Sequence, residues 1–188
     1  TRWLLAGAGA AAVFVVVYIS FMGYAGDRVT AWLHPELDPG DTGYQILQSL
    51  YAIGSGGLFG LGYGKSRQKY LYLPFQYNDY IFAVICEELG LVGAMAIVAL
   101  FAVTILRGYW IALNARDRFS TVLAAGLVTL IAVQTILNLC VVTNLLPSTG
   151  IALPFFSYGG TALAVNLGEM GIVLGISRGR NRRKIQEA

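Results

Sequence analysis

The chain has 188 residues, of which 56% are hydrophobic and only 12% are charged. Because a soluble globular domain carries roughly 25% charged residues, this chain has too few charges to cover a surface that faces water on all sides. Its mean hydropathy of +0.64 and its 23 glycines are typical of packed transmembrane helices. The net charge of +3 is too small to indicate a nucleic-acid partner. Composition therefore predicts an all-α membrane protein.

The cysteines and the histidine point to no reactive site. Cys86 and Cys140 both lie in apolar runs, where we expect them to pack as small buried side chains. His34 is the only histidine, which argues against Ser-His catalysis and against a metal site built on several histidines. The chain begins with Thr1, and no secretory cleavage site follows its first apolar run, so we expect a fragment of a longer protein.

Four apolar runs are long enough to cross a membrane core, which takes roughly 20 helical residues. They cover residues 3–24, 81–106, 119–143 and 161–177. The third run contains Gln134 and Asn138 at i,i+4, and the fourth contains Asn166 and Glu169 at i,i+3. Each polar pair therefore shares one helix face. The sequence predicts a polytopic protein with four transmembrane helices in one membrane domain.

The lysines and arginines predict the orientation of these spans. Nine of them fall on the side that holds both termini, and four fall on the opposite side. Because cytoplasmic segments carry the excess of positive charge, we expect both termini, including the tail of residues 178–188, in the cytoplasm. Residues 25–80 then form a large outer loop, in which the pattern of residues 42–53 predicts a helix at the membrane surface or re-entering the membrane.

A glycine-rich run in this outer loop leads into a group of cations. It does not match a phosphate loop, because Phe59 stands where the first glycine of that loop is required. Close backbone packing is the structural alternative. Lys65, Arg67 and Lys69 follow on the outer side, either as solvated charges or as a site for a lipid-linked phosphate or pyrophosphate.

The carboxylates of the chain are few, and Asp79 is the foremost candidate for chemistry. It lies where the aromatic outer loop meets the span that begins at residue 81. One interpretation is a helix N-cap; the other is a general base, because a partly dry, aromatic-lined pocket raises the proton affinity of a carboxylate. Glu87, Glu88 and Glu169 lie deeper in their spans, where we expect them to be paired or hydrogen-bonded, with a direct chemical role as the alternative.

Two stretches carry long and specific motifs. The first contains GYQ at 43–45, QSL at 48–50, AIGSGGLFG at 52–60, QKYLYLP at 68–74, NDYIFA at 78–83 and EELG at 87–90. The second contains LPSTG at 146–150 and LPFFSYGG at 153–160. Together they resemble the SEDS family of bacterial cell-wall polymerases, which includes RodA, FtsW and SpoVE, with the run at 68–74 closer to the FtsW and SpoVE branch. One departure is Phe75, which stands where the family usually has glutamate.

The resemblance implies the C-terminal half of a protein with ten transmembrane helices, the four spans here being the last four. It also implies that Asp79 is the family's essential aspartate and that the complete protein joins lipid II into β-1,4-linked glycan strands, releasing undecaprenyl pyrophosphate. Asp79 would take the proton of the attacking hydroxyl, and Lys65, Arg67 or Lys69 would stabilise the pyrophosphate. Ser157, in the second motif, is expected to bind substrate.

The same resemblance implies a bacterial cytoplasmic membrane protein whose partner is a class B penicillin-binding protein, a transpeptidase. It implies no definite cofactor; a divalent cation, magnesium or manganese, is a candidate for sharing the charge of the pyrophosphate. Elongation, division and sporulation stay open as the cellular role. Two alternative functions also stay open: transport of lipid II across the membrane, with Glu87, Glu88 and Glu169 as a polar path, and a scaffold without chemistry of its own.

Overall fold

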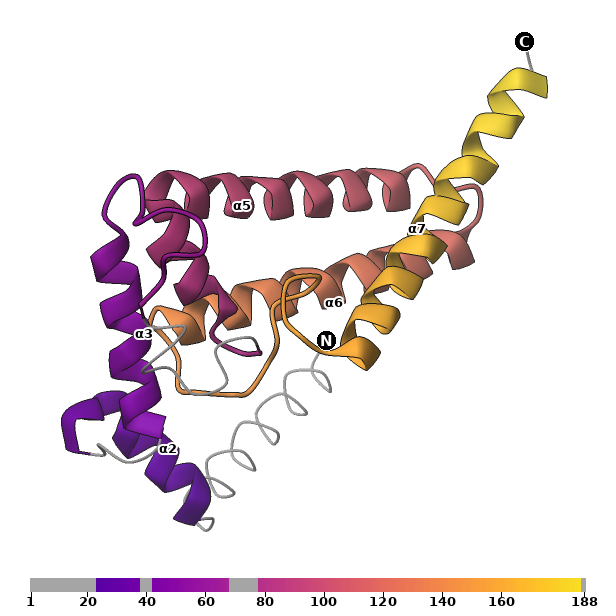
Figure 1. Ribbon diagram of the computed structural model, residues 1–188. Coiled ribbons are helices and arrows are strands. Elements are labelled where there is room, and N and C mark those ends of the chain that lie inside the picture. The colour runs from indigo at the N-terminus through magenta and orange to yellow at the C-terminus, as the bar shows by residue number, and fades with distance from the viewer. Residues whose placement is uncertain (1–22, 38–41, 68–77, 187–188) are drawn as a thin grey trace.

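The computed structural model describes residues 23–37, 42–67 and 78–186 of the chain. This part is built from α2 (Gly23–Leu33), η1 (Pro35–Leu37), α3 (Thr42–Gly56), α5 (Ile81–Leu113), α6 (Arg118–Val142) and α7 (Gly160–Gln186). These ranges contain no strand, in agreement with the predicted all-α class. α5 and α6 lie side by side, α7 crosses them at an angle, and α3 packs against the other end of α5 (Figure 1).

Three helices in the described ranges are long and apolar enough to cross a membrane, namely Ile81–Leu113, Arg118–Val142 and Gly160–Gly179. They correspond to the second, third and fourth predicted spans. The first predicted span, residues 3–24, lies outside the described residues except for Gly23 and Tyr24, which begin α2. The count of four spans therefore stays a prediction.

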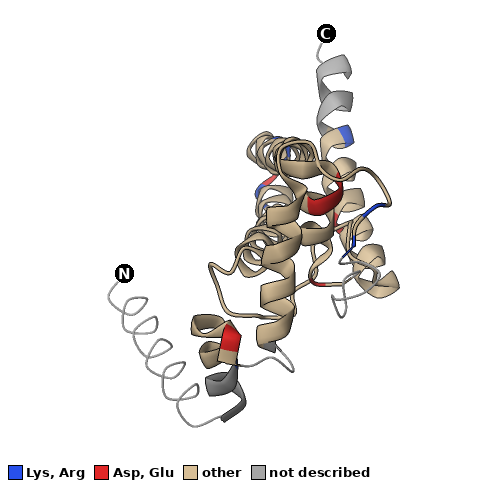
Figure 2. Ribbon diagram, turned by 60° about the vertical axis from the view of Figure 1, so that its left-hand side comes forward, with Lys and Arg blue, Asp and Glu red and all other residues tan. Residues whose placement is uncertain are grey.

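Some helices run further than their sequence patterns indicated. α5 continues to Leu113, seven residues past the predicted end at residue 106, and α7 continues to Gln186, through most of the predicted tail of residues 178–188. Both extensions begin where arginines follow the apolar run, so hydropathy alone does not detect them. The helix expected over residues 42–53 is present as α3 and ends at Gly56. Charged residues are sparse along the ribbon (Figure 2).

α5 bends at Gly90, where the backbone leaves helical geometry with φ 68° and ψ −169°. The bend is visible in Figure 1 as a change in the direction of the helix. It interrupts the helical hydrogen bonds that would join Glu87 to Leu91 and Glu88 to Val92. A helix broken at membrane depth needs new partners for the freed backbone groups, because lipid offers none.

The glycine-rich run supplies these partners. Leu91 and Val92 donate their N–H groups to the carbonyls of Gly57 and Leu58 (2.9 and 3.2 Å). In return, the N–H groups of residues 61 and 62 donate to the carbonyls of residues 87 and 88 (2.9 and 3.0 Å). A side chain on Gly60 or Gly90 would collide with the backbone of the segment that packs against it. The glycines thus have the structural role that the sequence left as the alternative to a phosphate site.

The larger of two buried apolar clusters in the described ranges joins α3, α5, α6 and the connection of residues 144–160. It includes Ala52, Ala83, Val142 and Leu153, together with Tyr80, which is 2% exposed. Because Tyr80 is anchored in this core, the preceding residue is fixed at its edge. That residue is Asp79.

Candidate active site

Asp79 lies in a turn formed by residues 78–80, immediately before α5. The N-cap residue of α5 is Tyr80, and no side chain makes a capping hydrogen bond there. The N-cap interpretation of Asp79 is therefore wrong. The Asp79 side chain is half-buried just before the helix and makes no capping hydrogen bond to it.

The backbone of this turn is held from two sides. The side-chain amide of Asn138, on α6, donates to the carbonyl oxygens of Asp79 and Ile151, both at 2.8 Å. The hydroxyl of Ser157 donates to the carbonyl of Asn78 at 2.5 Å and accepts from the N–H of Leu153 at 2.7 Å. The two motifs found in the sequence thus meet here, since Ser157 of the second motif forms a hydrogen bond to the turn that carries Asp79.

The carboxylate of Asp79 faces the connection of residues 144–160. A methyl group added to Gly150 would lie 3.7 Å from Oδ2 of Asp79, so this glycine leaves room beside the carboxylate. The guanidinium of Arg28, on α2, donates to the carbonyl of Ser148 at 3.0 Å. Helix α2, the connection and the turn therefore converge on one carboxylate.

Burial and charge act on Asp79 in opposite directions. Burial raises the pKa of its carboxyl above the ordinary value, and the positive charge of Arg28 opposes part of that rise. Burial also raises the pKa of the neighbouring Tyr80 phenol, where Ser148 lies close without hydrogen-bond geometry. A carboxyl group whose proton affinity is increased by burial suits a general base.

Two of the three predicted cations, Lys65 and Arg67, are exposed in the loop after the glycine-rich run, and neither is among the charges that shift the pKa of Asp79. Lys69 lies outside the described residues, as does Phe75. Among the residues that the structure describes, Arg28 is the cation whose charge acts on Asp79.

The interior carboxylates differ in their surroundings. Glu87 is 1% exposed; it accepts hydrogen bonds from the hydroxyl of Ser66 and, at 2.9 Å, from the N–H of Arg67. Within the described ranges, one carboxylate oxygen each of Glu88 and Glu169 is buried without a hydrogen-bond partner. These same ranges contain no group of three or more His, Cys, Asp or Glu residues placed to hold a metal ion. A magnesium or manganese ion stays a prediction.

Sequence reasoning missed three residues of this site. Asn138 had been placed on a polar face with Gln134, a signal of an interior role, but the sequence did not show which atoms it would bind. Arg28 is one of the four lysines and arginines that the sequence assigns to the side opposite the termini, and it lies 51 residues before Asp79 in the chain. Ser148 contributes a backbone carbonyl, which no sequence motif reveals.

Comparison with known proteins identifies the family of this chain. The family model FTSW_RODA_SPOVE, described as "Cell cycle protein", matches residues 1–182. The chain belongs to this family. Family membership and the three apolar helices make it part of a multi-pass membrane protein.

Relatives with curated names come from the branch that the sequence predicted. Stage V sporulation protein E of Bacillus subtilis is 50% identical over 151 residues, which are 80% of this chain and 41% of that protein. The "Probable peptidoglycan glycosyltransferase FtsW" of Trichlorobacter lovleyi is 45% identical over 174 residues, 92% of this chain and 46% of that protein. The chain thus spans less than half the length of these relatives.

Two solved structures share the fold. One is described as "Structural coordination of polymerization and crosslinking by a peptidoglycan synthase complex"; it matches with a TM-score of 0.76 and 30% identity, over 95% of this chain and 49% of that one. The other is a mutant of the rod shape determining protein RodA of Thermus thermophilus, with a TM-score of 0.54 and 33% identity, over 70% of this chain and 40% of that one. The predicted relationship to SEDS proteins is confirmed.

Proposed function

We propose that this chain is the C-terminal half of a peptidoglycan glycosyltransferase that joins lipid II units into β-1,4-linked glycan strands and releases undecaprenyl pyrophosphate. The family match, the relatives named glycosyltransferases and the similarity to a peptidoglycan synthase complex support this proposal. The observation that carries it is the Asp79 turn. Its backbone is held by Asn138 and Ser157, and its carboxylate is not used to cap α5.

In the proposed reaction, Asp79 removes the proton of the attacking sugar hydroxyl. The hydroxyl oxygen forms a bond to the anomeric carbon of the donor, and the bond from that carbon to the pyrophosphate oxygen breaks. The pyrophosphate leaves with the bonding electrons, and the proton stays on Asp79. Glycosidases need a second carboxyl group as an acid for a poor leaving group; a pyrophosphate leaves without one. Inversion at an α-linked donor gives the β linkage.

Cations near the site would stabilise the charge that develops on the pyrophosphate. Arg28 is the first candidate, because its charge already acts on Asp79 and its guanidinium points to the same connection. Lys65, Arg67 and Lys69 remain candidates for binding the pyrophosphate. Both hydrogen bonds of the Ser157 hydroxyl are internal, so we assign it to positioning the turn, with substrate binding as its second role.

The orientation that fits this reaction places Asp79, α2 and α3 on the outer side of the cytoplasmic membrane. Arg107, Arg116, Arg118 and Arg178 support it, because they lie toward the ends of α5, α6 and α7 that are opposite to Asp79. A transpeptidase of the class B penicillin-binding type is the proposed partner. The similarity to a chain of a peptidoglycan synthase complex supports that proposal.

The experiment that tests this function uses the full-length protein with its partner, lipid II and Asp79→Asn. We expect polymer formation to fall at least about a thousand-fold, while the complex still assembles. Asp117→Asn is the matched control, because Asp117 caps α6 at its far end through the N–H of Ser120 (2.9 Å), a bond that asparagine also accepts. Polymer formation by Asp79→Asn would refute the catalytic role. Loss of assembly would favour a scaffold, and loss of lipid II movement in vesicles with polymerisation intact would favour transport.

A further inference from the structure

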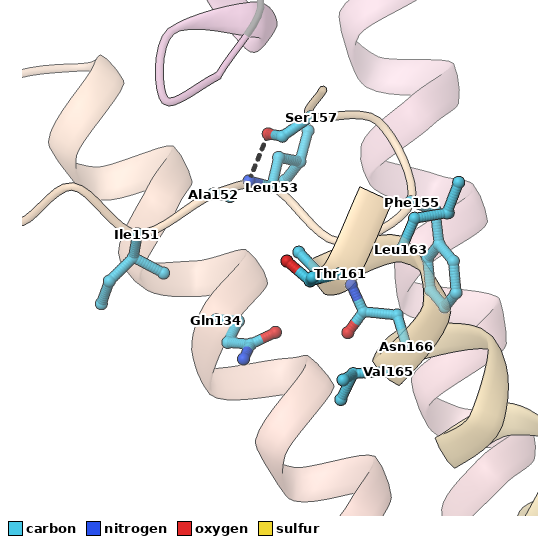
Figure 3. A pocket seen from close by; sticks show the side chains of 11 residues that line it. Gln134, Ile151, Ala152, Leu153, Phe155, Ser157, Thr161, Leu163, Val165 and Asn166 are labelled. Carbon is cyan, nitrogen blue, oxygen red and sulfur yellow. Dashed lines mark hydrogen bonds between the residues drawn. The ribbon is translucent and has the colours of Figure 1, made fainter. Parts of the chain in front are cut away.

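A cavity of about 450 Å³ lies between α6, α7 and the connection of residues 144–160. Figure 3 shows Gln134, on α6, and Thr161 and Asn166, on α7, projecting toward it from two sides. Phe155 completes the wall with a left-handed backbone conformation (φ 65°), which is rare for a bulky residue. The volume falls within the range of pockets that bind small molecules, roughly 300–1,000 Å³.

The lining of this cavity is uncharged and combines apolar side chains with the polar groups of four residues, Gln134, Ser157, Thr161 and Asn166. None of the described residues that form it is charged. Asn166 is only 6% exposed, yet in the part of the chain that the structure describes neither its amide nor that of Gln134 has a side-chain hydrogen bond. Two amides that line the cavity, a hydroxyl and an aromatic ring form a set that suits a neutral ligand with several hydrogen-bonding groups.

The cavity shares its wall with the Asp79 turn. Ile151 and Ser157 both line it. The carbonyl of Ile151 and that of Asp79 accept from the same Asn138 amide, and Ser157 donates to the carbonyl of Asn78. A ligand in the cavity would therefore lie next to the backbone that positions the proposed base.

We propose that this cavity, called here the amide pocket and defined by Gln134, Phe155, Thr161 and Asn166, binds an N-acetylated sugar ring of the glycan substrate. The amides of Gln134 and Asn166 pair with its acetamido and hydroxyl groups, and Phe155 packs against the ring. The inference rests on the proposed function and adds the positions of the sugar and the pyrophosphate of the substrate. The neutral sugar occupies the uncharged pocket, and the pyrophosphate stays outside it, on the side of the cations.

Binding to the full-length protein with Asp79→Asn tests the pocket without turnover. The probe is lipid II with a shortened lipid chain. Asn166→Leu removes the amide at similar volume and is expected to weaken binding about ten-fold. Asn114→Leu is the control, because the Asn114 amide donates to the carbonyl of Trp110 at the far end of α5 (2.8 Å). The control is expected to bind like the parent.

A second probe, the same lipid II without its acetyl groups, separates sugar recognition from a general effect on folding. The parent should prefer the acetylated probe, and Asn166→Leu or Gln134→Leu should reduce that preference. Ala162 lines the pocket, so Ala162→Phe should fill the space and weaken binding of both probes while both amides remain.

Unchanged affinity of Asn166→Leu for the acetylated probe would overturn the proposal, as would unchanged binding after Ala162→Phe. Equal loss for both probes in Asn166→Leu with a lowered unfolding temperature would also overturn it, because the defect would then lie in folding. Polymer synthesis is measured separately with Asp79 intact. Its absence would refute the proposed function, whereas reduced preference in Asn166→Leu would still support a sugar site.

Discussion

The side-chain amide of Asn138 donates to the backbone carbonyl of Asp79 at 2.8 Å, and the same nitrogen donates to the carbonyl of Ile151. Asn138 is 1% exposed, so these bonds form away from solvent. One α6 side chain therefore fixes the proposed base to the connection that faces it. The geometry of the site depends on α6 as much as on α5.

Asn138→Leu should remove both bonds and leave two carbonyl groups without their donor. Because an unsatisfied buried polar group costs about 1–3 kcal/mol, we expect a loss of unfolding free energy of about 2 kcal/mol or more. Polymer formation should also fall, since the turn loses its anchor. Thermal unfolding in detergent and the polymerisation rate measure the two effects. Asn114→Leu, which replaces an exposed asparagine just after the far end of α5, is the control, and a similar loss of rate there would contradict a specific role for Asn138.

Arg28→Gln should change the pH dependence of the reaction. Burial raises the pKa of Asp79 and the charge of Arg28 lowers it, so removing that charge raises the pKa further. A general base works only when ionised, and the acidic limb of the pH–rate profile should therefore move to higher pH. Arg28→Lys keeps the charge and should keep the limb near its original position. A uniform loss of rate at every pH, with no movement of the limb, would show that Arg28 acts only on structure.

Gly90→Ala should destabilise the fold. The backbone at residue 90 has a positive φ, and an added methyl group would collide with the backbone of Leu58 and Gly60. The expected loss is about 2 kcal/mol or more of unfolding free energy. Gly126→Ala, in α6, is the matched control because open space surrounds that position. Equal stability of the two variants would mean that the helix and the glycine-rich run do not approach this closely.

Glu87→Gln should also destabilise the loop that follows the glycine-rich run. The two carboxylate oxygens of Glu87 accept from separate donors, the hydroxyl of Ser66 and the N–H of Arg67. An amide presents an NH₂ group in place of one oxygen, so one donor loses its acceptor, at a cost of about 1–3 kcal/mol. Glu88→Gln is the comparison, since one oxygen of Glu88 has no partner among the described residues. Thermal unfolding of both variants measures the difference. A larger loss of stability for Glu88→Gln than for Glu87→Gln would contradict this prediction.

The parts of this structure that follow from the sequence are those that depend on local composition. Hydropathy located α5, α6 and α7, and the pattern of residues 42–53 predicted α3. Asp79 was found because it is one of few carboxylates and lies where the aromatic outer loop meets a span. The N-cap interpretation failed because the N-cap position falls one residue later, at Tyr80, whose side chain is buried in the core.

The remainder depends on contacts between distant residues. Arg28 reaches Ser148 across 120 positions of the chain, and Ser66 reaches Glu87 across 21. Whether a cation lies near a carboxylate depends on how the helices pack, and the sequence around either residue does not show it. The cations nearest to Asp79 in the sequence were therefore the natural prediction, and the structure brings a different one beside it.

The exchange of backbone hydrogen bonds at Gly90 also limits how the length of the chain can vary. Residues 57 and 58 accept from α5, and residues 61 and 62 donate to it, so the spacing between the two pairs is set by the helix. An insertion or deletion of one residue at Leu58–Gly60 would put donors where acceptors are required. The side chain of Phe59 has room to change, since it is 82% exposed, but the number of residues in this run is fixed.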